Sequence, residues 1–189
     1  MKLKDAISIL AGIGDDATKI LHKKVGKVKG LDAIEKQIRD EATKSAEKSF
    51  GGKLDRVAQV HIDKYVTKRM GYMKKAFKKL DNPKTDTSKQ RGDRIGVNET
   101  KTARDFGFTK GLERLAKTRK KNIYKSWVTN GDGCPTCTAN EDEGPIPIDD
   151  MFSSGDYAPT AHPGCDCDLE FTDDDGNAVD VDYDEGDED

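Results

Sequence analysis

The chain has 189 residues, of which 33% are hydrophobic and 37% are charged, so apolar side chains are scarce for a single large core. No apolar run approaches the roughly 20 residues that a membrane-spanning helix needs, and we therefore expect no membrane partner. This composition predicts long helices, one small stabilised module and some disorder.

The charges are divided between two halves of the chain. Residues 1–125 contain all 33 Lys and Arg and 16 Asp and Glu, which gives a net charge of +17 (33 minus 16). Residues 126–189 contain no Lys or Arg and 20 acidic residues. Such asymmetry indicates a polyanion, such as DNA, or an acidic partner for the first half. A solvated helical surface explains the same Lys content, so both interpretations stay open.

The sequence pattern predicts that the first half of the chain is helical. Short apolar clusters separated by Gly favour three helices before residue 50, at about 3–11, 15–25 and 31–49. Between Leu54 and Leu80, apolar side chains recur every three or four residues, which is the pattern of one long amphipathic helix.

The following segments change character. Asp81-Asn82-Pro83 ends that helix, and residues 82–92 predict a polar loop. A further helical stretch runs from about Arg94 to Lys120, and we expect a break near Gly107–Gly111.

The second half predicts short strands and a tail. Residues 122–129 are rich in β-branched and aromatic side chains, which favours a strand. Residues 146–148 and 151–152 are apolar segments expected to contact a core, and residues 168–171 predict a closing strand. The sequence after Thr172 is acidic and holds almost no core residues, so it predicts disorder.

Five potential zinc ligands lie close together in the pattern C-x2-C…H-x2-C-x-C, namely Cys134, Cys137, His162, Cys165 and Cys167. Tetrahedral Zn²⁺ takes four nitrogen or sulfur ligands, usually from two short-spaced pairs. Disulfides between the pairs, or free thiols, are alternatives. Five donors more than fill four positions, which favours a structural zinc over a catalytic one. We predict one Zn²⁺ bound by Cys134, Cys137, Cys165 and either Cys167 or His162.

Together these segments predict an α+β fold that is predominantly α. We expect a basic helical region at 1–89, a zinc-stapled module containing β-strands at 90–172 and a disordered acidic tail at 173–189. The phosphate-binding patterns G-x-x-x-x-G-K-[ST] and G-x-G-x-x-G do not occur in the sequence, so ATPase and dinucleotide-binding functions lack support.

Several motifs in residues 90–171 resemble the phage Mu F-like head morphogenesis family. They are R-x-G-x-N-E-T from Arg94 to Thr100, K-S-W-V-T-N-G-D from Lys125 to Asp132, C-P-T-C, G-P-I-P-I-D-D-M-F and H-P-G-C-D-C. Two positions depart from the family pattern. Asp166 stands where the family usually has Arg between the last cysteines, and Asn98 stands where Arg is common.

The resemblance implies a minor head protein of a tailed phage that acts in head morphogenesis near the portal, inside the capsid. Its implied partners are portal and capsid or scaffold proteins, and it would reach the virion from the host cytoplasm during assembly. It implies no defined enzymatic activity. A zinc-dependent nuclease and a zinc-ribbon nucleic-acid-binding protein are the alternative functions.

Three further motif residues receive structural roles. We expect Trp127, the only Trp of the chain, to pack over the metal module. Glu99, on the expected first turn of a helix, would cap it or pair with Arg94 or Arg104. Asp132 beside Gly133 fits a turn and could orient a ligand cysteine.

Overall fold

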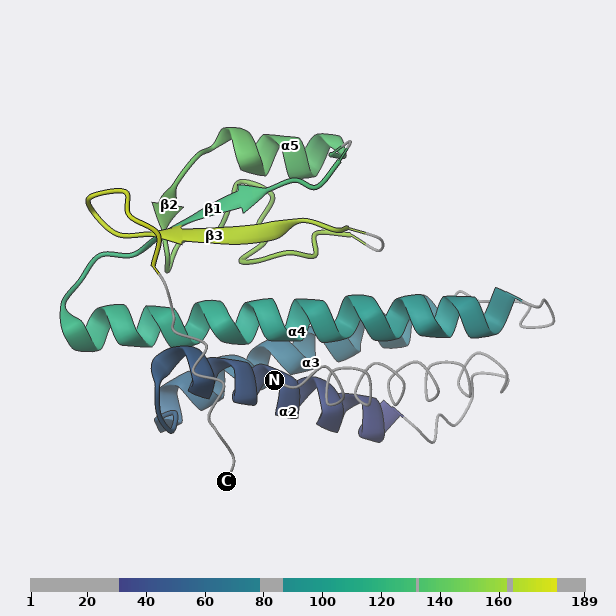
Figure 1. Cartoon of the computed structure of the whole chain (residues 1–189). Coiled ribbons are helices and arrows are strands. Elements are labelled where there is room, and N and C mark those ends of the chain that lie inside the picture. The colour runs from purple at the N-terminus through teal and green to yellow at the C-terminus, as the bar shows by residue number, and fades with distance from the viewer. Residues whose placement is uncertain (1–30, 79–86, 132, 163–164, 180–189) are drawn as a thin grey trace, which may run out of the picture.

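The computed structural model describes residues 31–78, 87–131, 133–162 and 165–179. The fold is α+β and mostly helical, as the sequence predicted. Its elements are α2 (Leu31–Phe50), α3 (Arg56–Lys78), α4 (Thr87–Arg119), β1 (Tyr124–Val128), α5 (Pro135–Asp142), β2 (Ile146–Pro147) and β3 (Asp168–Thr172). Figure 1 shows α4 lying between the other two long helices and the sheet, with α5 on the far side of the sheet. The helices expected at 3–11 and 15–25 lie outside the described residues.

We call α2, α3 and α4 the helical bundle. Their apolar stripes meet in one core that contains Leu31, Ile34, Ile38, Ala42, Ala46, Ile62, Val66, Met70, Met73 and Ala103. The helices predicted at 31–49 and 54–80 are therefore confirmed as α2 and α3, although α3 begins at Arg56 instead of Leu54. They bury their apolar faces against each other. None of the described helices is long and apolar enough to cross a membrane.

Local signals explain where these helices end. The backbone N–H groups of Gly51 and Gly52 both reach the carbonyl of Glu47, at 3.0 and 3.1 Å, and Gly51 has φ of 76°. This is a glycine helix stop that satisfies the last carbonyls. Asp55 then accepts a hydrogen bond from the backbone N–H of Ala58 at 2.9 Å, so it caps the start of α3.

Helix α4 corrects two sequence predictions. It begins at Thr87, so the loop expected at 82–92 is wrong from residue 87 onward, and it continues to Arg119 without the break expected at Gly107–Gly111. A Cβ at Gly107 would lie 2.1 Å from the carbonyl oxygen of Ala42, and one at Gly111 would lie 1.9 Å from Ser49 Oγ. These glycines let α4 approach the backbone of α2 closely, and tertiary packing outweighs their poor helix propensity.

Two α2 serines strengthen this close approach. Ser45 donates a hydrogen bond to the carbonyl of Arg104, and Ser49 donates one to the carbonyl of Phe108, both at 2.8 Å. Small residues on both helices therefore form an interface in which side chains of one helix bond the backbone of the other.

We call residues 122–172 the C-terminal module. Its sheet has the order β2-β1-β3, and β1 pairs antiparallel with both neighbours. The strands predicted at 122–129 and 168–171 are confirmed as β1 and β3. The short apolar segments place Ile148 and Phe152 in the interior at 5% and 1% exposure, whereas Met151 is exposed.

The described start of the predicted acidic tail, residues 173–179, forms an ordered turn that contacts β3. The Asp173 carboxylate accepts hydrogen bonds from the backbone N–H groups of Asp175 and Asn177 at 3.0 and 2.9 Å. The turn returns the chain to β3, where the N–H of Val179 donates to the carbonyl of Phe171 at 2.9 Å. An aspartate that bonds its own backbone is a turn former, and residues 180–189 lie outside the described part.

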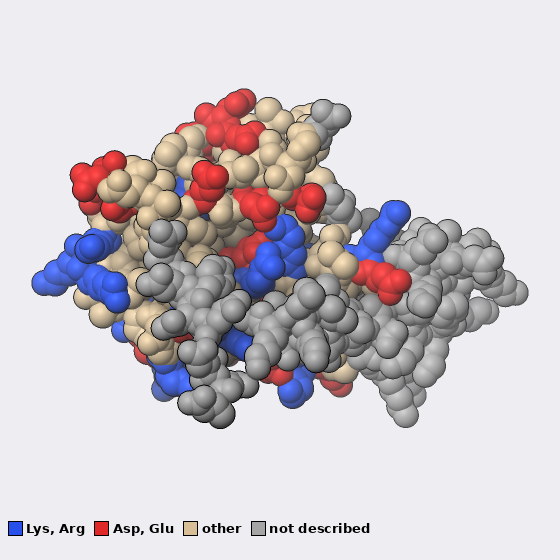
Figure 2. Space-filling view, viewed as in Figure 1, with Lys and Arg blue, Asp and Glu red and all other residues tan. Residues whose placement is uncertain are grey.

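Polar contacts join the module to α4. Lys101 of α4 pairs with Asp168 of β3, and the hydroxyls of Thr102 and Thr160 lie 2.7 Å apart. Figure 2 shows acidic side chains gathered over the sheet and α5, with Lys and Arg clustered near the C-terminal end of α4. The charge asymmetry of the sequence is thus also visible on this face of the molecule.

Candidate metal centre

All five predicted ligands come together at one end of the sheet. Cys134 and Cys137 lie at the start of α5. His162 and Cys165 lie in the loop that leads into β3, and Cys167 is the residue directly before that strand. Two groups, Cys134–Cys137–His162 and Cys137–Cys165–Cys167, each have ligand atoms within 4.8 Å of one another. This cluster could hold a metal ion, and Cys137 belongs to both groups.

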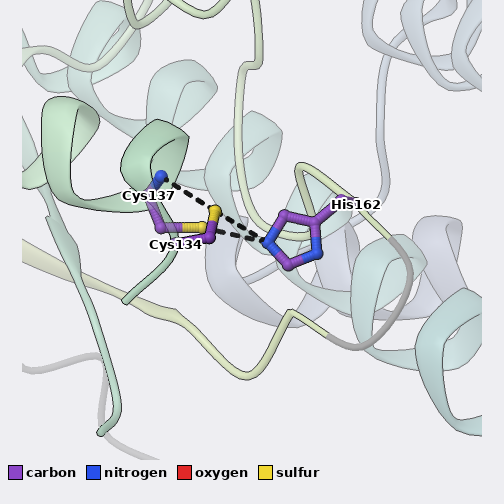
Figure 3. A group of neighbouring side chains, drawn as sticks. All are labelled: Cys134, Cys137 and His162. Carbon is purple, nitrogen blue, oxygen red and sulfur yellow. Dashed lines mark hydrogen bonds between the residues drawn. The ribbon is translucent and has the colours of Figure 1, made fainter. Parts of the chain in front are cut away.

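Figure 3 shows Cys134 and Cys137 directed at the His162 ring. His162 Nε2 lies 3.1 Å from Cys134 Sγ and 3.5 Å from Cys137 Sγ. Cys137 Sγ lies 3.7 Å from Cys165 Sγ. All four cysteines are free thiols in this structure, because a disulfide would need a sulfur separation of about 2.0 Å.

Helix α5, which the sequence analysis did not predict, positions the first cysteine pair. Cys134 is the N-cap residue, Pro135 follows at the first helical position, and Cys134 Sγ accepts the backbone N–H of Cys137 at 3.4 Å. Proline at the first position was the available sequence signal. This backbone hydrogen bond, with further help from Thr136 and His162, lowers the pKa of Cys134 to about 7.

The other thiols lie inside the module. Cys137, Cys165 and Cys167 are 1%, 5% and 4% exposed. Burial and the neighbouring cysteines raise the pKa of Cys137. Burial also raises the pKa of Cys167, although the indole of Trp127 opposes that change. Cys137 and Cys167 therefore resist ionisation in this apolar interior, and a bound cation would replace their protons.

Trp127 packs over the cluster, as predicted. It is 1% exposed and shares a hydrophobic cluster with Cys137, Cys165, Cys167 and Phe152. The Phe152 ring meets the indole edge to face, with centroids 5.1 Å apart. The indole Nε1 is buried, and among the described residues no acceptor meets the geometry of a full hydrogen bond with it, although it lies near enough to the Cys167 thiol to affect that thiol's pKa. Asp132, the neighbouring motif residue, lies outside the described part of the chain.

Glu99 takes a different role from the one predicted. It lies well inside α4, which begins at Thr87, so it is not at a helix start. Arg69 of α3 binds its carboxylate with two hydrogen bonds of 3.0 and 2.6 Å. The pairing expected with Arg94 or Arg104 is therefore wrong. No local pattern identifies this partner, because 30 residues separate the two side chains.

The sequence patterns did not indicate that Lys125 of β1 is a buried lysine with a perturbed environment. Lys125 is 0% exposed in mid-strand, donates to the carbonyl of Tyr157 at 2.9 Å and lies 3.5 Å from the centre of the Tyr157 ring. Burial and the nearby charge of Lys110 lower the pKa of Lys125 to about 7. The alternation of buried and half-buried residues in β1 places it on the same side as Trp127.

Tyr157 connects this lysine to a charged network on α4. Its hydroxyl lies 2.7 Å from Glu113 Oε2. Burial alone would raise the pKa of Glu113, but hydrogen bonds from Lys110, Lys117 and Tyr157 lower it to about 2. Glu113 therefore stays ionised at neutral pH and holds two lysines and a tyrosine at the boundary between the bundle and the module.

A groove borders the metal cluster. It has a volume of about 910 Å³ and lies between α3, α4 and residues 151–162, with His162 on its wall. Tyr65, Phe106 and Tyr157 supply aromatic surface, and Lys64 and Lys68 add positive charge. His162, one of the predicted ligands, is thus also part of the surface of this groove.

Comparisons with known proteins give no relative for this chain. No protein-family model, curated protein or solved structure matches it. The similarity to the Mu F-like family therefore rests on the motifs alone.

Proposed function

We propose that the Cys/His cluster binds one structural Zn²⁺. The separation of Cys137 and Cys165 supports this proposal most directly. With Zn–S bonds of about 2.3 Å, two sulfurs of a tetrahedral site lie about 3.8 Å apart. The observed Sγ separation is 3.7 Å. The ligands would be Cys134, Cys137 and Cys165, with either Cys167 or His162.

The metal would cross-link two segments of the C-terminal module. It would join the start of α5 to the segment that leads into β3, and these two parts are separated by more than 20 residues of sequence. Zinc bound by such a pair of turns contributes folding free energy, because the unfolded chain has no preformed site. Five donors for four positions leave no place for a reactive water, so we propose that the protein is not an enzyme.

Elemental analysis tests this proposal. Full-length protein purified under reducing conditions should contain one zinc per chain, and a strong chelator should lower the melting temperature. Protein without metal that shows two disulfides by mass spectrometry would contradict the proposal.

We also propose that the chain is a minor head protein of a tailed phage. The support is that motifs separated by up to 40 residues belong to one structural unit. K-S-W forms β1, C-P-T-C begins α5, I-P-I-D contains β2 and H-P-G-C-D-C leads into β3. Short motifs that match a family by chance would not be expected to lie together in one structural unit. The proposed partners are portal and capsid or scaffold proteins, inside the virion near the portal.

Two observations in the phage test this proposal. Genes for terminase, portal and capsid proteins should flank this gene, and mass spectrometry of purified virions should detect the chain in few copies per particle. Deletion should then yield defective heads. Normal, infectious particles that lack the protein would contradict a role in head morphogenesis.

Packaged DNA is a further proposed partner. The exposed basic side chains at the end of α4 and directly after it are Lys117, Arg119, Lys120 and Lys121. They resemble a phosphate-binding surface more than a base-reading one. Binding should therefore be insensitive to DNA sequence and fall steeply with salt. Weak binding at low salt would leave a protein as the partner of this surface.

A further inference from the structure

Five candidate donors compete for four positions around the proposed zinc. We infer that the four cysteines are the ligands, and that His162 and Trp127 instead donate N–H hydrogen bonds to the thiolates of Cys134 and Cys167. This inference rests on the proposed zinc site and names its ligand set.

The position of His162 fits a hydrogen bond better than a metal ligand. For a sulfur and a nitrogen on one tetrahedral zinc, bonds of about 2.3 and 2.05 Å place the two atoms about 3.6 Å apart. His162 Nε2 satisfies this separation toward Cys137, at 3.5 Å, but lies only 3.1 Å from Cys134 Sγ. As ligands, the latter pair would need an angle of about 90° at the metal. A ring N–H that donates to the Cys134 sulfur has no such conflict.

Exposure also separates the two candidates for the fourth position. Cys167 is 4% exposed and lies in the hydrophobic cluster with Cys137 and Cys165. His162 is half-buried and forms part of the groove wall. A structural zinc is a closed site, and Cys167 closes it from the inside.

Trp127 supplies an independent argument for Cys167. Trp127 pairs with Leu169 in the sheet, and Cys167 comes two residues before Leu169, so the indole and this cysteine are diagonal neighbours. The indole N–H can only donate, and it is buried where no acceptor among the described residues meets the geometry of a full hydrogen bond with it. Leaving such a buried donor unpaired is unfavourable. A metal-bound thiolate at Cys167 is the acceptor that this position lacks.

The charge of the site calls for such donors. Four thiolates around one Zn²⁺ carry a net charge of −2 in an apolar interior. N–H groups that point at the sulfurs spread this charge and orient the ligands. The indole and the imidazole therefore have a role in the loaded site without occupying a coordination position.

Zinc X-ray absorption on the full-length protein tests the ligand set. We expect four sulfurs at about 2.3 Å and no nitrogen at about 2.0 Å. His162→Ala should keep four sulfurs, whereas Cys167→Ser should lose one. Three sulfurs and one nitrogen in the wild type would overturn this inference and leave the zinc proposal intact. Absence of zinc from the wild type would contradict the zinc proposal and the inference together.

Co²⁺ in place of zinc tests Trp127. Trp127→Phe keeps an aromatic ring in the core but removes the N–H together with part of the indole. Loss of the N–H should move the thiolate-to-cobalt charge-transfer band to lower energy, and affinity should fall about 10- to 100-fold. Phe152→Leu is the matched control, because it disturbs the same ring contact without removing a donor, and its band should stay in place. An unchanged band in Trp127→Phe would overturn the role of Trp127. If that variant does not fold, the sulfur count of Cys167→Ser still decides whether Cys167 is a ligand.

Discussion

The helical bundle and the C-terminal module differ in what fills their interiors. The bundle core consists of aliphatic side chains and Met from all three long helices. The interior around Trp127 holds three cysteines beside two aromatic rings, and the other apolar cluster of the module, around Ile123 and Ile148, is shared with α4. Apolar burial can hold a helical bundle together, but a module with so little apolar surface of its own needs another source of stability.

Substitution of Cys137, which belongs to both ligand groups, should produce the largest difference in stability between the C-terminal module and the helical bundle. Cys137→Ser removes a ligand common to both groups, and structural zinc sites are worth on the order of 10 kcal/mol. We expect zinc loss and protease cleavage within residues 122–172, while circular dichroism retains the signal of the long helices. Asp166→Asn, an exposed change between two ligands, is the control and should keep the metal. Simultaneous loss of the bundle would show that the two parts fold as one unit.

Gly107→Ala should instead destabilise the helical bundle and leave the metal site of the C-terminal module unchanged. The new Cβ would lie 2.1 Å from the Ala42 carbonyl oxygen, so the helices must move apart, at a cost of about 3 kcal/mol. Denaturant unfolding should detect this loss, and zinc should remain bound. Gly71→Ala, on α3 with open space around it, should instead stabilise by about 0.5–1 kcal/mol. Equal effects of the two substitutions would contradict the close contact between α2 and α4.

Glu99→Gln probes the ion pair within the bundle. It removes the charge that Arg69 binds with two hydrogen bonds, and both side chains are largely buried. We expect a loss of about 2 kcal/mol in the free energy of unfolding. Glu47→Gln removes the partner of the exposed Lys53 and should change stability by less than about 1 kcal/mol. Similar losses at both positions would argue against a special role for the Arg69 pair.

The buried lysine at the boundary predicts a smaller, pH-dependent effect. The pKa of Lys125 is about 7 in the folded chain, below its ordinary value of 10.5, so the unfolded state binds more protons between these values. Stability should therefore rise with pH in this window, by about 1 kcal/mol between pH 7 and pH 8. In Lys125→Met this part of the pH dependence should disappear. A wild-type stability that falls over the same interval would contradict the assignment.

Local patterns in the sequence sufficed where one segment determines the outcome. The apolar spacing in 31–49 and 54–80 indicated two helices, the β-branched run gave β1, and the spacing of Cys and His indicated the cluster. They failed where a distant partner decides. Gly107 breaks a helix in isolation, but against Ala42 it permits close packing. Glu99 finds Arg69 from another helix, and a short helix such as α5 has too few residues for a periodic signal.

Hydrogen exchange measured with and without a strong chelator, under reducing conditions, tests the central claim most directly. If a metal holds the C-terminal module while packing holds the bundle, chelation should remove protection from the amides of β1, α5 and β3. The amides of α2 and the middle of α4 should keep theirs. Protection that is unchanged throughout by the chelator, or lost equally in both parts, would contradict the account.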